Sequence, residues 1–232
     1  MPVYTPFAFV KQQTTSYVTS NLILNLMAYD VNSYPGSGSI INDMSGNNLN
    51  GTISGSVSFN SSGYLNFNGS TNYVSVITNS LLTLGTAFTL DNYIWVDNYA
   101  ERWRITHKWV TTATGQGYTF SSQVTNGRLF SYVNAAFAGN NLTPNAIGTG
   151  AWKQAVLVRD GNSTIFYING TEFWNVATNT TAATIANTSN LYFGHSPIDN
   201  EYGEGRWAHG RIYSRALSPA EVLQNYNALP AL

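Results

Sequence analysis

Hydrophobic and polar residues alternate with a period of two along much of this chain. The alternation covers residues 64–67, 72–76, 88–96 and 164–168, and residues 155–158 form a short continuous apolar run. A period of two places every second side chain on the same face, which is typical of strands with one buried face. The pattern therefore predicts an all-β protein made of many short strands.

Turn residues separate these runs. Asp160-Gly161 lies between two predicted strands and is the clearest hairpin signal. Asn126-Gly127, between residues 118–124 and 128–133, predicts a second hairpin, because Asn and Gly tolerate the positive φ of tight turns. Residues 177–190 are rich in Thr and Asn and predict a polar loop. Frequent turns between short strands favour a sandwich or barrel.

One helix is predicted at the end of the chain. Ser218 is placed to cap it, Pro219 occupies the first helical position, and Glu221 completes a capping box. Val222 and Tyr226 then fall on one apolar face. We expect a short C-terminal helix that closes the domain.

The first twenty residues differ from the rest of the chain. Residues 1–20 combine two prolines and several aromatic residues with a polar Gln/Thr/Ser run. We expect an outer strand packed on the same sandwich, an arm that docks on another subunit, or a disordered segment. Residues 21–232 are expected to form one β-sandwich domain.

Composition narrows the possible partners. The 232 residues include 43% hydrophobic but only 9% charged residues, with a net charge of −1, whereas soluble domains average about 25% charged residues. No basic run is present, so we expect no nucleic-acid binding. The chain has no cysteine, no window that would span a membrane and no secretory signal pattern. A neutral surface rich in amides and hydroxyls suits sugars or other protein shells.

A series of landmarks occurs in a characteristic order. They are residues 29–30, 33–38, 43–48, 50–52, 65–74, 152, 160–161, 166–170, 191–194 and 210–218. Over residues 21–229 the order resembles the laminin-G-like domain of the concanavalin A-like lectin/glucanase superfamily. The resemblance implies a two-sheet antiparallel jelly-roll sandwich. Ser33–Gly38 ahead of residues 43–47 is similar to the variety found in bacteriophage structural proteins.

The last strands can be oriented from this pattern. Leu191 and Phe193 are expected to point inward, and Gly194 to make room beside them. Ile212 is expected to enter the core, whereas Arg211 and Tyr213 should face outward.

Several family carboxylates are absent. The resemblance implies an acidic pair just before Arg211, but Ala208 and His209 occupy those positions, and Gly210 replaces an aliphatic residue. Asn68 and Asn72 stand where the family often has Asp. A calcium site, which needs several carboxylates, is therefore less expected here than in the family, and we predict no cofactor.

Two acidic residues keep the calcium alternative open. Asp30 and Asp43 flank the Ser33–Gly38 loop and could share a cation. Both are equally placed to cap turns through their side chains, which is the role that the sequence favours.

A first set of candidate ligand-binding residues occurs late in the chain. It combines carboxylates, aromatic rings and a cation: Asp199, Glu201, Tyr202, Arg206 and Trp207. Flanking prolines and glycines predict a loop at the rim of the sandwich, where this fold carries binding sites. The alternative is a solvated loop with Trp207 packed on the sheet edge.

A second set contains Tyr99, Arg102 and Trp103. These residues could form a recognition patch. An amphipathic strand that lays its arginine stems along the sheet is an equally good interpretation.

Catalysis is not expected. A glycosidase needs two carboxylates facing one another across a cleft. Asp199 and Glu201 would share a strand face but Glu204 would not, and the segment resembles a loop more than a strand. We predict no catalytic residue.

The leading functional hypothesis is a non-enzymatic virion surface protein, either a capsid decoration protein or part of a fibre. It would dock to other virion proteins through residues 1–20 and attach, as a multivalent oligomer, to glycans or the host surface. The alternatives are a bacterial carbohydrate-binding or adhesion module at the cell surface and, less favoured, a glycoside hydrolase. Neither membrane insertion nor nucleic-acid binding is expected.

Overall fold

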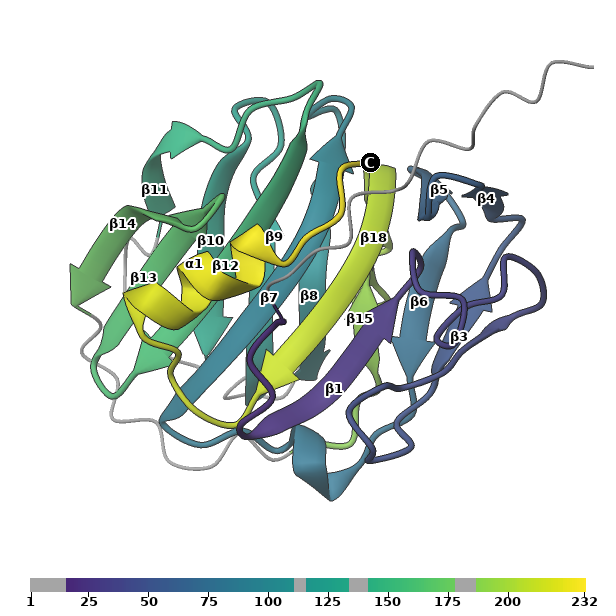
Figure 1. Ribbon diagram of the computed structural model, residues 1–232. Coiled ribbons are helices and arrows are strands. Elements are labelled where there is room, and N and C mark those ends of the chain that lie inside the picture. The colour runs from purple at the N-terminus through teal and green to yellow at the C-terminus, as the bar shows by residue number, and fades with distance from the viewer. Residues whose placement is uncertain (1–15, 111–115, 134–141, 178–186) are drawn as a thin grey trace, which may run out of the picture.

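The computed structural model describes residues 16–110, 116–133, 142–177 and 187–232. Two antiparallel sheets stack face to face, and one helix lies on the outer face of one sheet (Figure 1). The predicted all-β jelly-roll sandwich with a short C-terminal helix is confirmed. Within these described ranges, no helix is long and apolar enough to cross a membrane.

Sheet A carries the C-terminal helix. Among the described residues its spatial order is β14 (Thr171–Ala177), β13 (Ser163–Ile168), β12 (Trp152–Asp160), β7 (Ala87–Val96), β18 (Glu204–Tyr213), β5 (Tyr64–Asn68) and β4 (Ser58–Asn60). β1 (Leu22–Met27) also pairs with β18, along the half that β5 does not reach.

Sheet B forms the opposite layer. In the described part of the chain its order is β11 (Leu142–Ala146), β10 (Arg128–Val133), β9 (Gln116–Ser122), β8 (Arg104–Val110), β15 (Leu191–Phe193), β6 (Tyr73–Val76), β3 (Gly51–Ser54) and β2 (Ile40–Ile41). A small hairpin of β16 (His195–Ser196) and β17 (Glu201–Tyr202) extends from β15, and a short 3-10 helix covers Ser80–Leu82.

Both predicted hairpins are present. Asp160 pairs with Ser163 across the β12–β13 turn, where Gly161 has a φ of 54°. Gly127, with a φ of 61°, lies in the β9–β10 turn. The predicted polar loop at 177–190 begins where β14 ends, and its residues 178–186 lie outside the described ranges.

The main core lies between the two sheets, and it explains two small residues. A Cβ on Gly194 would lie 2.5 Å from the Phe67 ring, and one on Gly210 would lie 2.4 Å from the Phe193 ring. Leu191 and Phe193 are fully buried in this core, as predicted. Gly210 therefore replaces the family's aliphatic residue because the Phe193 ring occupies the space.

A second layer covers part of the outer face of sheet A. Helix α1 (Pro219–Asn227) lies across this face (Figure 1), and its predicted capping box is formed. The expectation that Arg211 and Tyr213 face solvent is wrong, since both are buried. They do point away from Ile212, but Val18 and Val222 pack over Tyr213 in a separate apolar cluster.

Residues 16–18 fasten onto their own sandwich. The Val18 N–H donates to Asn225 Oδ1 at 2.8 Å, and the Tyr213 hydroxyl donates to the Val18 carbonyl at 2.9 Å. Gln224 Nε2 also donates to the Ser16 carbonyl at 2.8 Å. The predicted arm is thus packed on the same chain at its end, without forming a strand, and residues 1–15 lie outside the described ranges.

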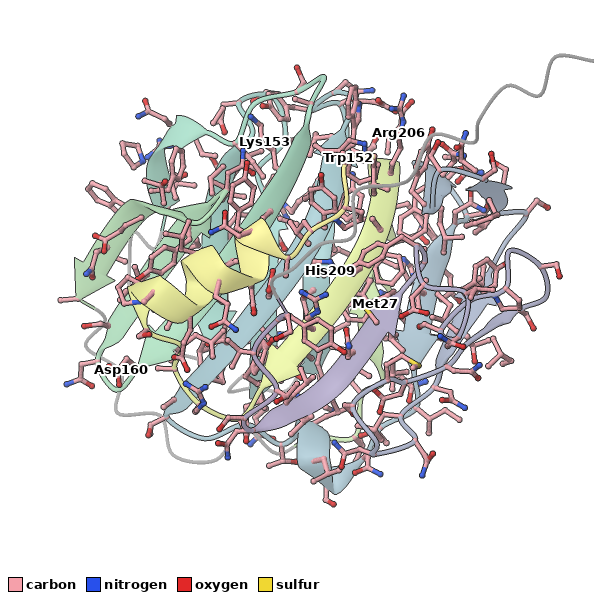
Figure 2. All side chains as sticks on the ribbon, viewed as in Figure 1. Met27, Trp152, Lys153, Asp160, Arg206 and His209 are labelled. Carbon is pink, nitrogen blue, oxygen red and sulfur yellow. The ribbon has the colours of Figure 1, made fainter. Side chains whose placement is uncertain are left out.

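A buried polar network lies beneath this layer, around His209 (Figure 2). Arg211 Nη2 donates to the Tyr29 hydroxyl at 2.8 Å, which lies 3.2 Å from His209 Nδ1; His209 Nε2 lies 3.4 Å from Asp91 Oδ1. Burial lowers the pKa of His209 to about 4. Neutral His209 thus accepts from Tyr29 and donates to Asp91, while Asn225 Nδ2 donates to Asp91 Oδ2 at 2.8 Å.

Candidate functional site

The two sets of residues singled out in the sequence meet at the rim of sheet B. Arg102 Nη1 donates to Glu201 Oε1 at 3.0 Å, and Arg104 Nε donates to Glu201 Oε2 at 2.6 Å. Arg104 also donates to Asp199 through Nη2. We call these four residues the rim cluster. Sequence reasoning selected Arg102, Asp199 and Glu201 but did not connect them, and it missed Arg104.

The β16–β17 hairpin brings the acids over β8. Gly194 N–H donates to the Arg104 carbonyl at 2.7 Å, so the chain leaves β15 directly beside β8. Asn200 turns the chain with a φ of 54°, and His195 then pairs with Tyr202. Glu201 and Tyr202 thus belong to a short strand, whereas the sequence predicted a loop; the tight turn at Asn200 allows this pairing.

The rim cluster is partly shielded from water. The side chain of Arg104 is 4% exposed, those of Glu201 and Arg102 are 19% and 29% exposed, and that of Asp199 is 44% exposed. Burial lowers the pKa of Arg104, and the charges of Glu201 and Asp199 oppose this shift. Two cations face two carboxylates, so the cluster offers hydrogen-bonding groups with almost no net charge.

Aromatic rings stack next to the rim cluster. The His195 and Tyr202 rings lie 4.2 Å apart at 21°, and Tyr73 stacks on His195 at 4.6 Å and 24°. Tyr192 meets His195 edge-on at 5.5 Å. We call Tyr73, His195 and Tyr202 the tyrosine–histidine stack. All three tyrosines are half-buried, so part of each side chain reaches the surface.

Sequence reasoning selected Tyr202 but missed the other rings of this surface. Tyr73 and Tyr192 alternate with buried residues in predicted strands, so the period of two alone places both side chains on the outer face of the sheet. That signal was available. His195 carried no comparable signal because it follows Gly194, where the predicted strand at residues 191–193 ends.

Two other candidates, Trp103 and Trp207, are not available to a ligand. Trp103 and Trp207 are fully buried, and both stack on Phe67, at 5.8 Å and 6.5 Å. Their proposed roles as ligand-binding rings are therefore wrong, since their faces contact the core. Tyr99 packs against the turn at Gly127 and is half-buried. The alternative interpretation, in which Trp207 packs on the sheet edge, is also only partly right, because Trp207 lies in the main core between the two sheets.

Arg206 belongs to a different surface. Its guanidinium lies 4.3 Å from the Trp95 ring centroid and 5.5 Å from that of Tyr64, on the outer face of sheet A. The rim cluster lies on sheet B. The five late-chain candidates are therefore split between one rim, the core and the opposite face.

The two weak calcium candidates cap turns. Asp43 Oδ1 accepts from the Asn25 and Ser45 N–H groups at 2.9 Å, and its Oδ2 accepts from the Leu49 N–H at 3.0 Å. Asp30 Oδ1 accepts from the Asn32 N–H at 2.9 Å. In the described residues, no three histidines, cysteines or carboxylates gather as metal ligands do. The turn-capping interpretation fits this geometry.

Solved structures with similar folds include those of two toxins and one trypanosomal enzyme. The binding domain of Paraclostridial Mosquitocidal Protein 1 superposes with a TM-score of 0.64 at 19% identity, over 90% of this chain and 52% of that one. Botulinum neurotoxin type C gives 0.66 at 16% identity, over 90% and 51%. Trypanosoma rangeli sialidase gives 0.67 at 15% identity, over 90% and 33%. This chain thus spans about half or a third of those chains, and the likeness shows the fold.

Comparison of the sequence with curated proteins finds no match. The family model for the concanavalin A-like lectin/glucanase superfamily, of the laminin-G type, matches residues 68–223. That match covers most of the sandwich described above, from the end of β5 to helix α1. The chain therefore belongs to the concanavalin A-like lectin/glucanase superfamily.

Proposed function

We propose that this protein is a non-enzymatic glycan-binding module and that its glycan contacts the rim cluster. The observation that carries the proposal is the position of the tyrosine–histidine stack beside two Arg–carboxylate pairs. Sugar rings offer C–H groups to aromatic surfaces and hydroxyls to fixed donors and acceptors. Ligand sites in general combine an apolar surface with a few precisely placed polar groups.

The polar groups of the rim cluster are fixed before a ligand arrives. Glu201 is held by two arginines, so its carboxylate cannot rotate freely. Asp199 is the most exposed of the four, and its Oδ2 also accepts from the Ser196 hydroxyl at 3.0 Å. A preorganised site loses little conformational entropy on binding, which suits a small hydroxyl-rich ligand.

Structures with the same fold support this class of ligand. Cell entry of botulinum neurotoxin type C depends on two ganglioside molecules, and the binding domain of neurotoxin DC has been solved with SialylT. The DC binding domain superposes with a TM-score of 0.65 at 16% identity. We extend only the general class, a glycan, to this chain.

The same geometry disfavours hydrolysis. A glycosidase needs one carboxyl group that donates a proton and a second that acts as nucleophile or base. Both Glu201 oxygens already accept hydrogen bonds from arginines, and Arg104 also pairs with Asp199. Glu201 is therefore poorly placed to protonate a leaving group, which leaves Asp199 without the second acid that hydrolysis needs, so the proposed role is binding.

At the level of the organism, we propose a bacteriophage virion protein, either a capsid decoration protein or part of a fibre. Support comes from the Ser33–Gly38 segment, from the low charge content, and from an N-terminal segment whose last residues are already ordered against the sandwich. Residues 1–15 would contact other virion proteins. Weak binding at each copy would then be multiplied by the number of copies.

The binding role is tested on arrays of bacterial and animal glycans with the 232-residue protein. We expect at least one glycan to bind the wild type, and Glu201→Gln or Tyr202→Ala to weaken it at least tenfold. Glu172→Gln is the matched control, because it removes an exposed carboxylate on edge strand β14. If the rim variants bind like the wild type, the rim cluster is not the site.

The virion role has its own test. Purified particles from the source that carries this gene are digested and analysed by mass spectrometry, and gold-labelled antibody locates the protein by electron microscopy. We expect the protein at many copies on the particle surface. Absence from purified particles would remove the virion proposal and favour a bacterial adhesion module.

A further inference from the structure

A row of directly paired residues crosses the outer face of sheet A. Arg206 on β18 pairs with Asn66 on β5 and with Trp95 on β7, and Trp95 pairs with Trp152 on β12. These four residues, which we call the cross-strand row, lie on four neighbouring strands. Neighbouring strands are about 4.8 Å apart, so the row extends over roughly 14 Å. Figure 2 shows Arg206 and Trp152 at the same end of the sandwich.

Arg206 has hydrogen-bond donors that the protein does not use. The other six arginines each donate to a carboxylate, carbonyl, hydroxyl or amide oxygen. Within the part of the chain that the structure describes, Arg206 makes no such bond, and its guanidinium carbon lies 4.3 Å from the Trp95 ring centroid and 5.5 Å from that of Tyr64. A guanidinium carries five N–H donors in a plane. Here they are held in place by ring contacts and remain open to an external acceptor.

Aromatic surface continues beyond the arginine. Trp152 meets the Trp95 ring edge-on at 6.1 Å and the Tyr64 ring at 5.3 Å. Trp95, Trp152 and Tyr64 are all half-buried, so part of each ring faces solvent. The Trp95 indole N–H donates to Asp97 Oδ1 at 2.8 Å, which fixes its ring plane. The rings therefore form a rigid surface next to unused donors.

The amide of Asn66 completes the row. Its Nδ2 donates to the Ser58 carbonyl at 3.2 Å and to the Ser58 hydroxyl at 3.0 Å. Those two bonds orient the side chain and employ the amide hydrogens, which leaves the carbonyl oxygen as an acceptor. The row thus presents an acceptor, a set of donors and an aromatic surface in sequence.

Nearby charges decide between neutral and acidic ligands. Asp97 is exposed beside Trp95, and Glu204 lies two residues before Arg206 on the same face of β18. Two carboxylates beside one guanidinium would repel a carboxylated sugar, whereas hydroxyl groups can both donate to the acids and accept from the arginine.

We propose that the cross-strand row is a second glycan-binding surface, specific for a neutral, hydroxyl-rich oligosaccharide. It lies on the opposite sheet from the rim cluster and does not depend on it. Sugar rings stack on Trp95 and Trp152, Arg206 donates to ring or hydroxyl oxygens, and Asn66 and Asp97 accept from hydroxyl groups. With two such surfaces, one molecule bridges two glycan chains.

The test is affinity gel electrophoresis of the 232-residue protein. The gels contain a neutral polysaccharide (dextran, glycogen, galactomannan or hydroxyethylcellulose) or an acidic one (alginate or polysialic acid). We expect at least one neutral polysaccharide to retard the protein and neither acidic one to do so. Arg206→Ala, Trp95→Ala and Asn66→Ala should each weaken the retardation at least fivefold.

Lys153→Ala is the matched control. Lys153 follows Trp152 on β12 but lies on the other face of that strand, so its removal takes away a nearby cation without touching the row. Tyr202→Ala at the rim separates the two surfaces, and it should leave the retardation by the neutral polysaccharide intact. Arg206→Ala alters a surface side chain, so we expect the variant to fold. A thermal melt checks this. If Arg206→Ala is unfolded, Asn66→Ala tests the row in its place.

The outcomes are distinct. If no neutral polysaccharide retards the wild type, or if Arg206→Ala and Asn66→Ala migrate like the wild type, the proposal is overturned. Retardation by the acidic polymers alone overturns the ligand class. Loss of retardation in Tyr202→Ala but not in Arg206→Ala assigns binding to the rim and also overturns it. Loss in Arg206→Ala alone supports the row even if the rim proposal fails.

Discussion

Asp91 is the carboxylate on which the outer layer of sheet A depends. It is fully buried, and Gln154, His209 and Asn225 contact its oxygens at 3.2, 3.4 and 2.8 Å. Arg211 Nη1 lies 3.9 Å from its Oδ2 and is fully buried too. Burial opposes ionisation of Asp91, but the hydrogen bond from His209 and the charge of Arg211 together hold its pKa below the usual range.

Replacing Asp91 with alanine should be strongly destabilising. The change leaves a buried guanidinium without its counter-charge and removes the acceptor of three side chains. Breaking a buried pair from one side costs about 3–5 kcal/mol. We therefore expect Asp91→Ala to lower the free energy of unfolding by about 4 kcal/mol. Asp97→Ala, an exposed acid on the same segment, should change it by less than about 0.5 kcal/mol.

Urea unfolding followed by tryptophan fluorescence measures this loss, since the midpoint falls while the slope stays constant if stability alone changes. The double variant Asp91→Asn with Arg211→Met is the decisive comparison. It removes both charges, nearly keeps the side-chain volumes and leaves an acceptor oxygen at position 91, so it should recover most of the loss. A cost below about 1 kcal/mol for Asp91→Ala, or a double variant as unstable as the single one, would refute the proposed role of the pair.

Other predictions concern stability elsewhere. Burial lowers the pKa of His209 from 6.5 to about 4, so the folded state binds fewer protons in that range. Stability present above pH 6.5 is then lost as the pH falls toward 4, by up to about 3 kcal/mol; His209→Gln should flatten the urea midpoint between pH 7 and pH 4.5, and an unchanged slope would contradict this. Val18→Ala removes two buried methyl groups and should cost about 2 kcal/mol in the same assay; a melt equal to wild type would show that the segment is not anchored. Arg104→Ala should cost about 2 kcal/mol and Arg102→Ala under about 1, because Arg104 is far more buried and pairs with two acids; equal losses would contradict the geometry. Gly210→Val should lower the melting temperature, since its Cβ would lie 2.4 Å from Phe193; a melt equal to that of the wild type would contradict the crowding.

Local signals in the sequence predicted most of the fold. The strands at 64–68 and 73–76 alternate half-buried and buried residues as their pattern indicated. The capping box at Ser218 involves only contacts within one turn, so its residues specify it without reference to the rest of the chain. Hairpin turns are local in the same sense.

The orientation of the last strand was less accessible. A register shift between Trp207 and His209 inserts one extra residue, so Trp207 and Arg211 face opposite sides of sheet A although four positions separate them. Parity continued back from Arg211 would have placed Trp207 outside. A β-bulge of this kind has no fixed sequence signature, and Pro197, Gly203 and Gly205 favoured a rim loop over a strand that reaches Trp207.

The rim cluster depends on contacts across the fold. Arg104 and Glu201 are 97 positions apart, and their pairing requires β15 to lie beside β8. No spacing rule predicts that neighbourhood. One signal was available in the low number of charged residues, which make up only 9% of the chain. Two arginines that lie close together need nearby acids when they are partly buried, and few acids are available to pair with them.

The low number of charged residues also affects how the surface of this protein could recognise a partner. Arg211 pairs with Asp91 beneath the outer layer, Arg215 pairs with Glu221 at the helix, and Arg102 pairs with Glu201 at the rim. Each of these cations is balanced by the protein itself, and Arg206 has two acids on its flank. Long-range attraction of a charged ligand needs an unbalanced patch, and none of these pairs supplies one. The glycan surfaces that we propose would therefore depend on short-range stacking and hydrogen bonds, the regime in which many copies together hold a weakly bound neutral ligand.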